Sequence, residues 1–143
     1  MTGRDAKHRS AAWLNKAGVR LTRQRLLIAG LLAGDGKHRH VTAESLYEAV
    51  RESGGKVALA TIYNTLKVFS QAGLLREITV NGTRSYFDTD VSNHAHFYCE
   101  DTGELADAGH GGSSGEVTVS NLPPAPEGTE ISRIDVVIRL RRV

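Results

Sequence analysis

Residues 58–89 constrain the fold most, because a regular amphipathic helix pattern is followed directly by a hairpin pattern. Apolar residues in 58–72 recur at spacings of three, four and three, which predicts a helix with one buried stripe. These residues are Leu59, Ile62, Leu66 and Phe69. The alternating segments LLREITV and TRSYFDT then flank Asn81-Gly82, a dipeptide that strongly favours a tight hairpin turn.

Three further helices are predicted upstream. Residues 5–17 form the first, which Gly18 ends, and Thr22 caps a second helix in RQRLLIAGLLAG. The apolar stripe expected on the second helix consists of Leu26, Leu27, Leu31 and Leu32. Val41-Thr42 begins the third helix, TAESLYEAVRES. Helix, turn, helix and hairpin in this order predict a winged helix in which residues 58–72 are the recognition helix.

The face of residues 58–72 opposite the apolar stripe is short, polar and carries one charge. It comprises Ala60, Thr61, Asn64, Lys67 and Val68, with Tyr63 at its edge. Small hydroxyl and amide side chains can bond base edges in a major groove, and an ordinary solvated helix is the alternative interpretation. Arg20, Arg23 and Arg25 gather at the start of the second helix, where cations oppose the helix dipole, so phosphate or a minor groove is one explanation and plain solubility the other.

The charge is distributed unevenly along the 143 residues. Residues 1–90 hold 14 Lys or Arg and 8 Asp or Glu, whereas residues 91–143 hold 4 and 8. The first part therefore suits a phosphate partner and the second part does not. No apolar run of membrane-spanning length occurs and the N-terminus lacks a hydrophobic segment, so we expect a cytoplasmic protein without a signal peptide.

His94 and His96 lie two residues apart on a predicted extended segment and therefore project to the same side. Such a pair suits a metal ion or haem iron, and a solvated strand face is the alternative. The chain after this pair reads as short strands in AHFYCED, ELADA, EVTVS and ISRIDVVIRLRR, with a turn at Thr102-Gly103. We expect so small a sheet to pair with a second copy, and we place His110 in a loop.

The chain resembles the ferric uptake regulator (Fur) family across residues 18–108. The resemblance rests on five motifs in family order: GVRLTRQR, HVTAESLYEAV, LATIYNTLKVFSQAGLL, SYFDT and HAHFYC. It implies an α+β protein with an N-terminal winged helix-turn-helix DNA-binding domain, residues 1–90, and a small α/β dimerisation domain, residues 91–143. It further implies a homodimeric transcription regulator that responds to metal, and a higher oligomer stays open.

By the same resemblance, one divalent metal per subunit is held between the domains. The implied ligands are His40, Asp88, His94 and His96. Three imidazoles and a carboxylate suit zinc, manganese or iron(II), and the ligand set does not choose among them.

The resemblance also has gaps. Cys99 stands at the first position of a structural zinc cysteine pair, but Thr102 replaces its partner, so a four-cysteine zinc site is excluded. A second sensing site is lost as well. Its ligand positions are taken by Asn93, Ala95 and Ile134. The long dimerisation helix typical of the family is absent from the pattern.

The ending NLPPAPEGTEISRIDVVIRLRR is most similar to the iron response regulator (Irr) branch of alphaproteobacteria. That branch implies control of iron and haem homeostasis, with haem at His94 or His96 and weakened DNA binding as the result. Phe97 and Tyr98 could pack on a porphyrin, and Cys99 is an alternative ligand or a small buried side chain. A manganese- or iron(II)-dependent repressor without haem sensing is the alternative.

The resemblance and the residue types together predict the contacts with an operator. Arg20 would enter a minor groove, Tyr63 and Thr61 would reach thymines, and the remaining contacts are base or phosphate contacts. The full predicted set is Arg20, Ala60, Thr61, Tyr63, Asn64, Lys67 and Arg84. A two-fold dimer predicts an AT-rich inverted repeat. An enzyme is not expected because no nucleophile motif, phosphate-binding loop or HExxH occurs, and a metal buffer or haem carrier is the third class.

Overall fold

The computed structural model describes residues 3–108 and 117–143. The chain divides into two compact units, unit 1 at Met1–Val91 and unit 2 at Ser92–Val143. Among the described residues, no helix is long and apolar enough to cross a membrane.

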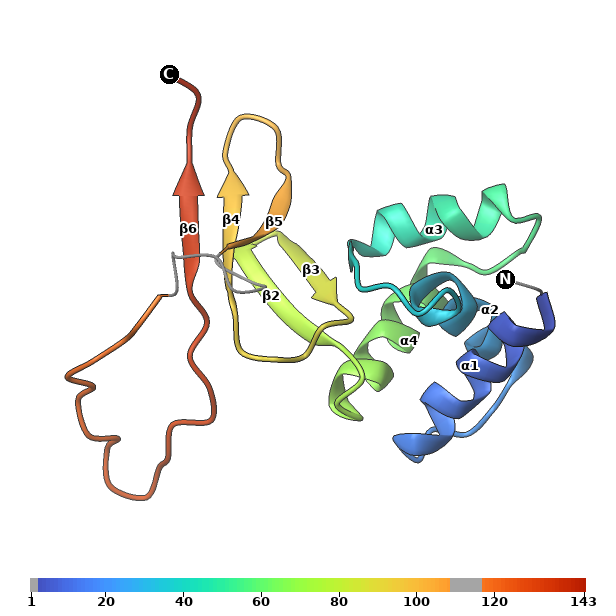
Figure 1. Ribbon diagram of the computed structural model, residues 1–143, viewed down its shortest axis with the longest axis horizontal. Helices are drawn as coiled ribbons and strands as arrows, with labels where there is room; N and C mark the ends of the chain where they lie inside the picture. Colours follow the sequence, from blue (N-terminus) through green and yellow to red (C-terminus); the bar gives the residue numbers. More distant parts are fainter. Residues whose placement is uncertain (1–2, 109–116) are drawn as a thin grey trace. The chain divides into compact units, whose positions relative to one another are not determined.

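Over its described residues 3–91, unit 1 contains four helices and a small antiparallel sheet (Figure 1). The helices are α1 at Gly3–Lys16, α2 at Arg23–Ala33, α3 at Ala43–Glu52 and α4 at Leu59–Gln71. The strands are β1 at His40–Val41, β2 at Arg76–Asn81 and β3 at Arg84–Asp88, in the order β1-β3-β2. This is the predicted succession of helices followed by a hairpin, and the α+β fold class is confirmed.

Local side-chain chemistry sets the ends of these helices. Thr22 caps α2 by accepting a hydrogen bond from the Arg25 amide at 3.2 Å, as expected. Thr42 and Ser45 form a reciprocal capping box at the start of α3. Gly18 follows α1 with φ of 72°, a conformation that glycine adopts without steric cost. These residues therefore mark the starts of α2 and α3 and the end of α1.

The core of unit 1 lies between the four helices and the sheet, and two predicted apolar stripes need correction there. On α2 the buried face runs through Ile28, Ala29 and Leu32, whereas Leu26, Leu27 and Leu31 are only partly buried. On α4 the buried stripe is Ile62, Leu66 and Phe69, but Leu59 is 38% exposed because it is the first residue of the helix. Phe69 packs edge-on against Trp13 with ring centroids 5.6 Å apart.

The hairpin turn lies one residue further along than predicted. Asn81 ends β2, and Gly82 and Thr83 make the turn. The Asn81 side-chain oxygen accepts from the amides of Thr83 and Arg84 at 3.0 Å each and from the Thr83 hydroxyl at 2.9 Å. An asparagine that replaces backbone partners in this way stabilises a tight turn, and it leaves Arg84 exposed at the start of β3.

Unit 2 contains three strands among its described residues. These are β4 at Ala95–Cys99, β5 at Leu105–Ala108 and β6 at Val137–Leu140. β4 is central, antiparallel to β5 and parallel to β6 (Figure 1). The strand predicted in EVTVS is wrong for residues 117–120, which pair with no strand in the described part of the chain. The last predicted strand is shorter than expected. The described part of unit 2 contains no helix, in line with the missing family helix.

Candidate metal centre and nucleic-acid surface

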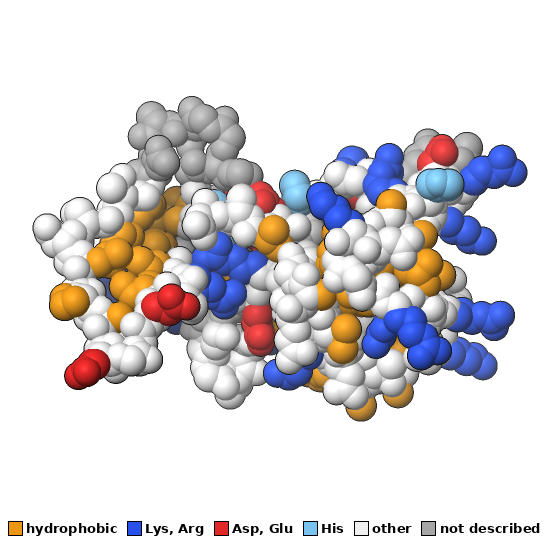
Figure 2. Space-filling view, turned by 90° about the horizontal axis from the view of Figure 1, so that it is seen from below, with side chains coloured by type: hydrophobic (Ala, Val, Ile, Leu, Met, Phe, Trp, Pro, Cys, Tyr) orange, Lys and Arg blue, Asp and Glu red, His pale blue; other side chains and the backbone are white. Residues whose placement is uncertain are grey.

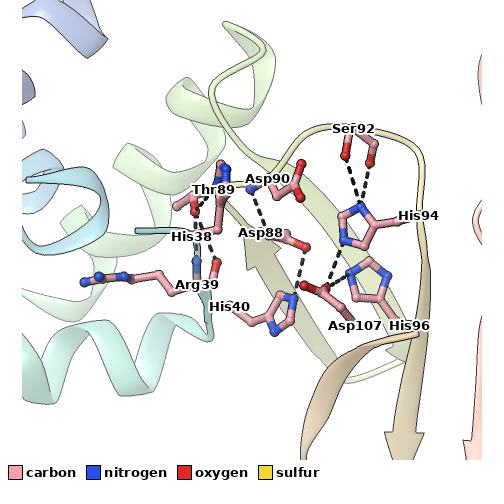
Figure 3. Close-up of polar contacts among 10 residues, drawn as sticks. All are labelled: His38, Arg39, His40, Asp88, Thr89, Asp90, Ser92, His94, His96 and Asp107. Carbon is pink, nitrogen blue, oxygen red and sulfur yellow. Dashed lines mark hydrogen bonds and ion pairs between the residues drawn. The ribbon is translucent and has the colours of Figure 1, made fainter. Parts of the chain in front are cut away.

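The first half-site lies in unit 1, where β1 pairs with the end of β3. His40 is directly opposite Asp88 in the strand register, and its Nε2 atom lies 3.0 Å from Asp88 Oδ2 (Figure 3). The other Asp88 oxygen accepts a hydrogen bond from the Asp90 amide at 2.8 Å. Because the Asp88 side chain is only 1% exposed, a cationic partner is needed to compensate for the loss of water around its charge.

The second half-site lies in unit 2, on the paired strands β4 and β5. His96 is directly opposite Asp107 in the register, and the His94 and His96 rings are 4.3 Å apart between centroids. Both Nε2 atoms face the same oxygen of Asp107, His94 at 3.0 Å and His96 at 3.5 Å (Figure 3). The two imidazoles thus converge on one point, as their spacing in the sequence predicted.

The tautomer of His94 indicates that a proton or a cation is needed between His94 and Asp107. Its Nδ1 atom lies 2.8 Å from the backbone carbonyl oxygen of Ser92, and a carbonyl oxygen can only accept, so Nδ1 carries the proton. In the neutral ring, Nε2 then presents its lone pair toward the carboxylate of Asp107 at 3.0 Å. Two acceptors at this distance repel each other unless the ring is protonated or a cation lies between them.

The separations between these atoms match those that a bound metal imposes. Ligand atoms about 2.1 Å from an ion lie about 3.0 Å apart at octahedral angles and about 3.4 Å apart at tetrahedral angles. The measured separations are 3.0 Å in unit 1 and 3.0 and 3.5 Å in unit 2. Each half-site therefore presents imidazole nitrogen and carboxylate oxygen in a geometry that suits zinc, manganese or iron(II).

Asp107 was missed by the analysis of the sequence. It lies in the segment ELADA, which offers no recognisable spacing to the two histidines. The predicted turn would not have found it: counting outward from Thr102-Gly103 places Asp107 opposite Tyr98, whereas the structure pairs Asp107 with His96. The register that brings the carboxylate opposite the imidazole centres the turn between Asp101 and Thr102, and no motif in the sequence marks that position.

The predicted nucleic-acid surface lies on α4 in unit 1. Ala60, Tyr63, Asn64 and Lys67 are exposed, as the pattern predicted, whereas Thr61 and Val68, predicted on the same face, are half-buried. Two grooves border this face. The first is lined by residues of the α2 start and of α4, namely Arg20, Thr22, Arg23, Gln24, Arg25, Thr61, Asn64, Thr65 and Val68. The second joins α3, α4 and the hairpin, and its basic residues are Lys67 and Arg84. All seven predicted contact residues thus belong to one unit.

An acidic residue on this surface was also missed. Glu44, in the first turn of α3, lines the second groove, and the Tyr63 hydroxyl donates a hydrogen bond to its Oε1 atom at 2.6 Å. This bond lowers the pKa of Glu44 and raises the pKa of Tyr63, because it stabilises the carboxylate and holds the phenol proton. Tyr63 is therefore oriented by α3 before any ligand is bound.

Comparison with known proteins agrees with this arrangement. The sequence matches the ferric uptake regulator family over residues 16–111, which include α2 to α4, the hairpin and all five half-site residues. The chain belongs to the ferric uptake regulator family. The predicted family is thereby confirmed, and because this is a family of regulators, so is the expectation that the chain is not an enzyme.

Two known proteins are similar to this ferric uptake regulator family member. The peroxide-responsive repressor PerR of Staphylococcus epidermidis is 41% identical over 98 residues, which are 68% of this chain and 64% of that protein. The chain thus spans less than two-thirds of the length of this relative. The ferric uptake regulator of Pseudomonas aeruginosa, solved with manganese, has a TM-score of 0.65 at 28% identity, covering 93% of this chain and 97% of that one.

The three residues predicted to stand at the lost ligand positions lie together in the structure of this family member. Asn93, Ala95 and Ile134 line one hollow in unit 2 together with His94. The rest of its lining is mostly aliphatic, with one cation: Val117, Val119, Ile131, Ser132, Arg133 and Val136. His94 therefore lies beside a hollow whose wall is mostly aliphatic.

Cys99 is half-exposed at the end of β4. Hydrogen bonding by the Thr102 side chain and by the amides of Thr102 and Asp101 lowers the pKa of the Cys99 thiol. Thr102 thus stabilises the thiolate at the position where a second cysteine was expected. Tyr98 is buried, with the Arg139 guanidinium 5.6 Å above its ring, and His110 lies outside the described residues.

Proposed function

We propose that this protein is a metal-dependent transcriptional regulator that binds an AT-rich inverted-repeat operator as a homodimer. The observation that carries the proposal is the exposed face of α4, which lies between two grooves that contribute five cationic side chains. They are Arg20, Arg23, Arg25, Lys67 and Arg84. If the short polar face of α4 contacts base edges in a major groove, cations on both sides of it can bind the phosphates that flank the groove.

We propose further that one divalent ion joins the two half-sites. His40 and Asp88 alone offer two ligand atoms, fewer than a stable zinc, manganese or iron(II) site needs. Unit 2 offers three more through His94, His96 and Asp107. An ion held by both units would restrict their relative freedom and so fix the distance between the two recognition helices of a dimer.

Unit 2 carries the features expected of a dimerisation domain. A three-stranded sheet is marginal in isolation, and several large hydrophobic side chains of unit 2 stay exposed (Figure 2). They include Val117, Val119, Leu122, Ile131 and Ile134. Covering them with the same surface of a second copy would remove apolar area from water and give a two-fold symmetric regulator.

Haem is the effector that the Irr-like ending favours. The hollow beside His94 supports haem binding, because its aliphatic side chains suit a porphyrin and Arg133 suits a propionate. A haem iron on His94 or His96 would compete with Asp107 and the divalent ion for the same imidazole. Haem would therefore weaken metal binding and, with it, DNA binding. The aliphatic hollow rather than the ring of Tyr98 would contact the porphyrin.

Peroxide is the second candidate effector. The identity of 41% to a peroxide-responsive repressor favours it. A nitrogen and oxygen ligand set without thiolate accepts iron(II), which peroxide oxidises, and the same set accepts manganese(II), which reacts far less readily. A regulator that responds to metal alone is the remaining alternative.

The test is fluorescence anisotropy of an AT-rich inverted-repeat duplex at constant salt, with metal-free protein and with manganese, zinc or iron(II) added. Salt must stay constant because phosphate contacts make the affinity strongly dependent on ionic strength. We expect binding only with metal, and loss of binding on addition of haem to the zinc or manganese form. Peroxide that releases DNA from the iron(II) form but not from the manganese form would assign that effector instead.

Two variants and a control make this test specific. Tyr63→Ala and Arg20→Ala should each weaken operator binding at least tenfold, since they remove a base contact and a minor-groove contact. Arg51→Ala removes an exposed arginine outside both grooves and should leave the affinity within about twofold of wild type. Wild-type affinity in both Tyr63 and Arg20 variants would refute the proposed surface.

A further inference from the structure

The residues that adjoin His40 and Asp88 bond to each other rather than to the ligands. Arg39 precedes His40 and Thr89 follows Asp88, at the point where β1 leaves β3. The Arg39 amide donates to the Thr89 hydroxyl oxygen at 2.9 Å, and the Thr89 amide donates to the Arg39 carbonyl oxygen at 3.1 Å (Figure 3). This exchange extends the pairing of the two strands beyond the ligands by one residue.

One of these two hydrogen bonds uses a side chain, because the Thr89 hydroxyl and not a backbone carbonyl accepts from the Arg39 amide. The Thr89 hydroxyl also lies 3.5 Å from His38 Nδ1. Thr89 is 8% exposed, so water is a poor substitute for the hydroxyl. β1 is only two residues long, so few other backbone bonds hold His40 opposite Asp88.

The Arg39 side chain fastens the same segment to α2. One guanidinium nitrogen donates to the Leu31 carbonyl oxygen in the last turn of α2 at 2.6 Å, and the other pairs with Asp35. Asp35 also accepts from the Lys37 amide at 3.0 Å, and these two bonds lower the pKa of its carboxyl. The loop between α2 and His40 is therefore anchored at both ends.

We propose that Thr89 and Arg39 are positioning residues that hold His40 and Asp88 ready for the metal and couple that half-site to α2. This inference rests on the proposed metal binding at His40 and Asp88. The start of α2 carries Arg23 and Arg25, which line the first groove, and its last turn bonds to Arg39. A helix transmits a displacement of one end to the other because its backbone is hydrogen-bonded throughout. Metal at the half-site thus stabilises the position of the arginines that face DNA.

Thr89→Val tests the first part, because valine keeps the shape of threonine and removes the acceptor. Groups that orient metal ligands typically contribute ten- to hundredfold to affinity, so we expect manganese to bind the full-length variant about tenfold more weakly. Thr89→Ser retains a hydroxyl and should restore wild-type affinity. Thr79→Val makes the same change on β2, where the hydroxyl contacts Ser85, and should leave the affinity unchanged.

Arg39→Met tests the coupling to α2. It also provides a second test of the positioning role if Thr89→Val does not fold. It should weaken manganese binding and reduce the effect of manganese on hydrogen exchange of the α2 amides. A purely structural role predicts lower thermal stability of the metal-free protein with unchanged manganese affinity, and that result would overturn the inference.

Amide exchange of the metal-free protein separates this inference from the proposed function. The Arg39 amide should exchange slowly in wild type and faster in Thr89→Val, whether or not metal binds. Wild-type protein that takes up no manganese, zinc or iron(II) would refute the metal-dependent function, whereas equally fast exchange in both proteins would refute the positioning role.

Discussion

Replacing Asp107 by asparagine should reduce metal affinity while leaving the shape of the second half-site intact. Both imidazole Nε2 atoms of unit 2 approach the same carboxylate oxygen, Asp107 Oδ1, at 3.0 and 3.5 Å. The amide of asparagine has almost the same volume but no charge, and its nitrogen cannot bind a cation. The variant therefore loses an anionic ligand without a cavity.

The expected magnitude follows from linkage. Free metal at a thousand times its dissociation constant stabilises the folded protein by about 4.1 kcal/mol, and a tenfold weaker site by about 2.7 kcal/mol. Groups that only orient metal ligands contribute ten- to hundredfold, so loss of a direct ligand should cost at least tenfold. The metal-dependent stabilisation of Asp107→Asn should thus be smaller than that of wild type by at least about 1.4 kcal/mol.

Titration calorimetry gives the affinity, and thermal unfolding with and without manganese gives the stabilisation. Asp101→Asn is the matched control, because it makes the same change in the turn between β4 and β5, where Asp101 accepts from the Arg142 amide. Wild-type manganese affinity in Asp107→Asn would refute the argument. The short separations would then reflect an ion pair between Asp107 and a protonated His94.

Three further predictions concern unit 1 and the thiol. Thr22→Ala removes the N-cap of α2 and should destabilise the protein by about 1 kcal/mol in urea unfolding, and retained stability would contradict the capping geometry. Glu44→Gln replaces the anionic acceptor that raises the pKa of Tyr63 by a neutral amide, so the phenol should ionise at lower pH in an ultraviolet titration referenced to Tyr63→Phe. Thr102→Val should raise the pKa of Cys99, so the pH midpoint of its alkylation should move upward, and an unchanged midpoint would exclude the hydroxyl as the cause.

Unit 1 could be predicted from the sequence because its structure is determined by local signals. Thr22 and Thr42 mark helix starts, Gly18 marks an end, and the hairpin follows from one dipeptide. Errors arise where neighbours in space decide. Leu59 fits the buried stripe of α4 by spacing, but the first turn of that helix has too little covering structure to bury it.

Unit 2 could be predicted less well because its elements depend on distant partners. Residues 117–120 alternate Val-Thr-Val-Ser as a strand would, yet no strand among the described residues pairs with them, and β propensity without a partner does not make a sheet. Asp107 shows the same limit for the site. Its role follows from its register opposite His96, which depends on the length of the turn rather than on any motif.

The division of the ligands between two units explains how metal could control DNA binding in the function proposed here. If all ligands lay in unit 2, the ion would bind whatever unit 1 did, and no binding free energy would favour one arrangement of the units. Because His40 and Asp88 belong to unit 1, the proposed shared site would reach its full affinity only when both units contributed ligands. Unit 2 is also net acidic and would be repelled by phosphate, so an arrangement that presents only the basic unit 1 to DNA has an electrostatic advantage. The metal would stabilise such an arrangement by no more than the difference between its binding free energies for the joined and the separated half-sites. Loss of any one ligand reduces this difference, so it should weaken metal binding and operator binding together.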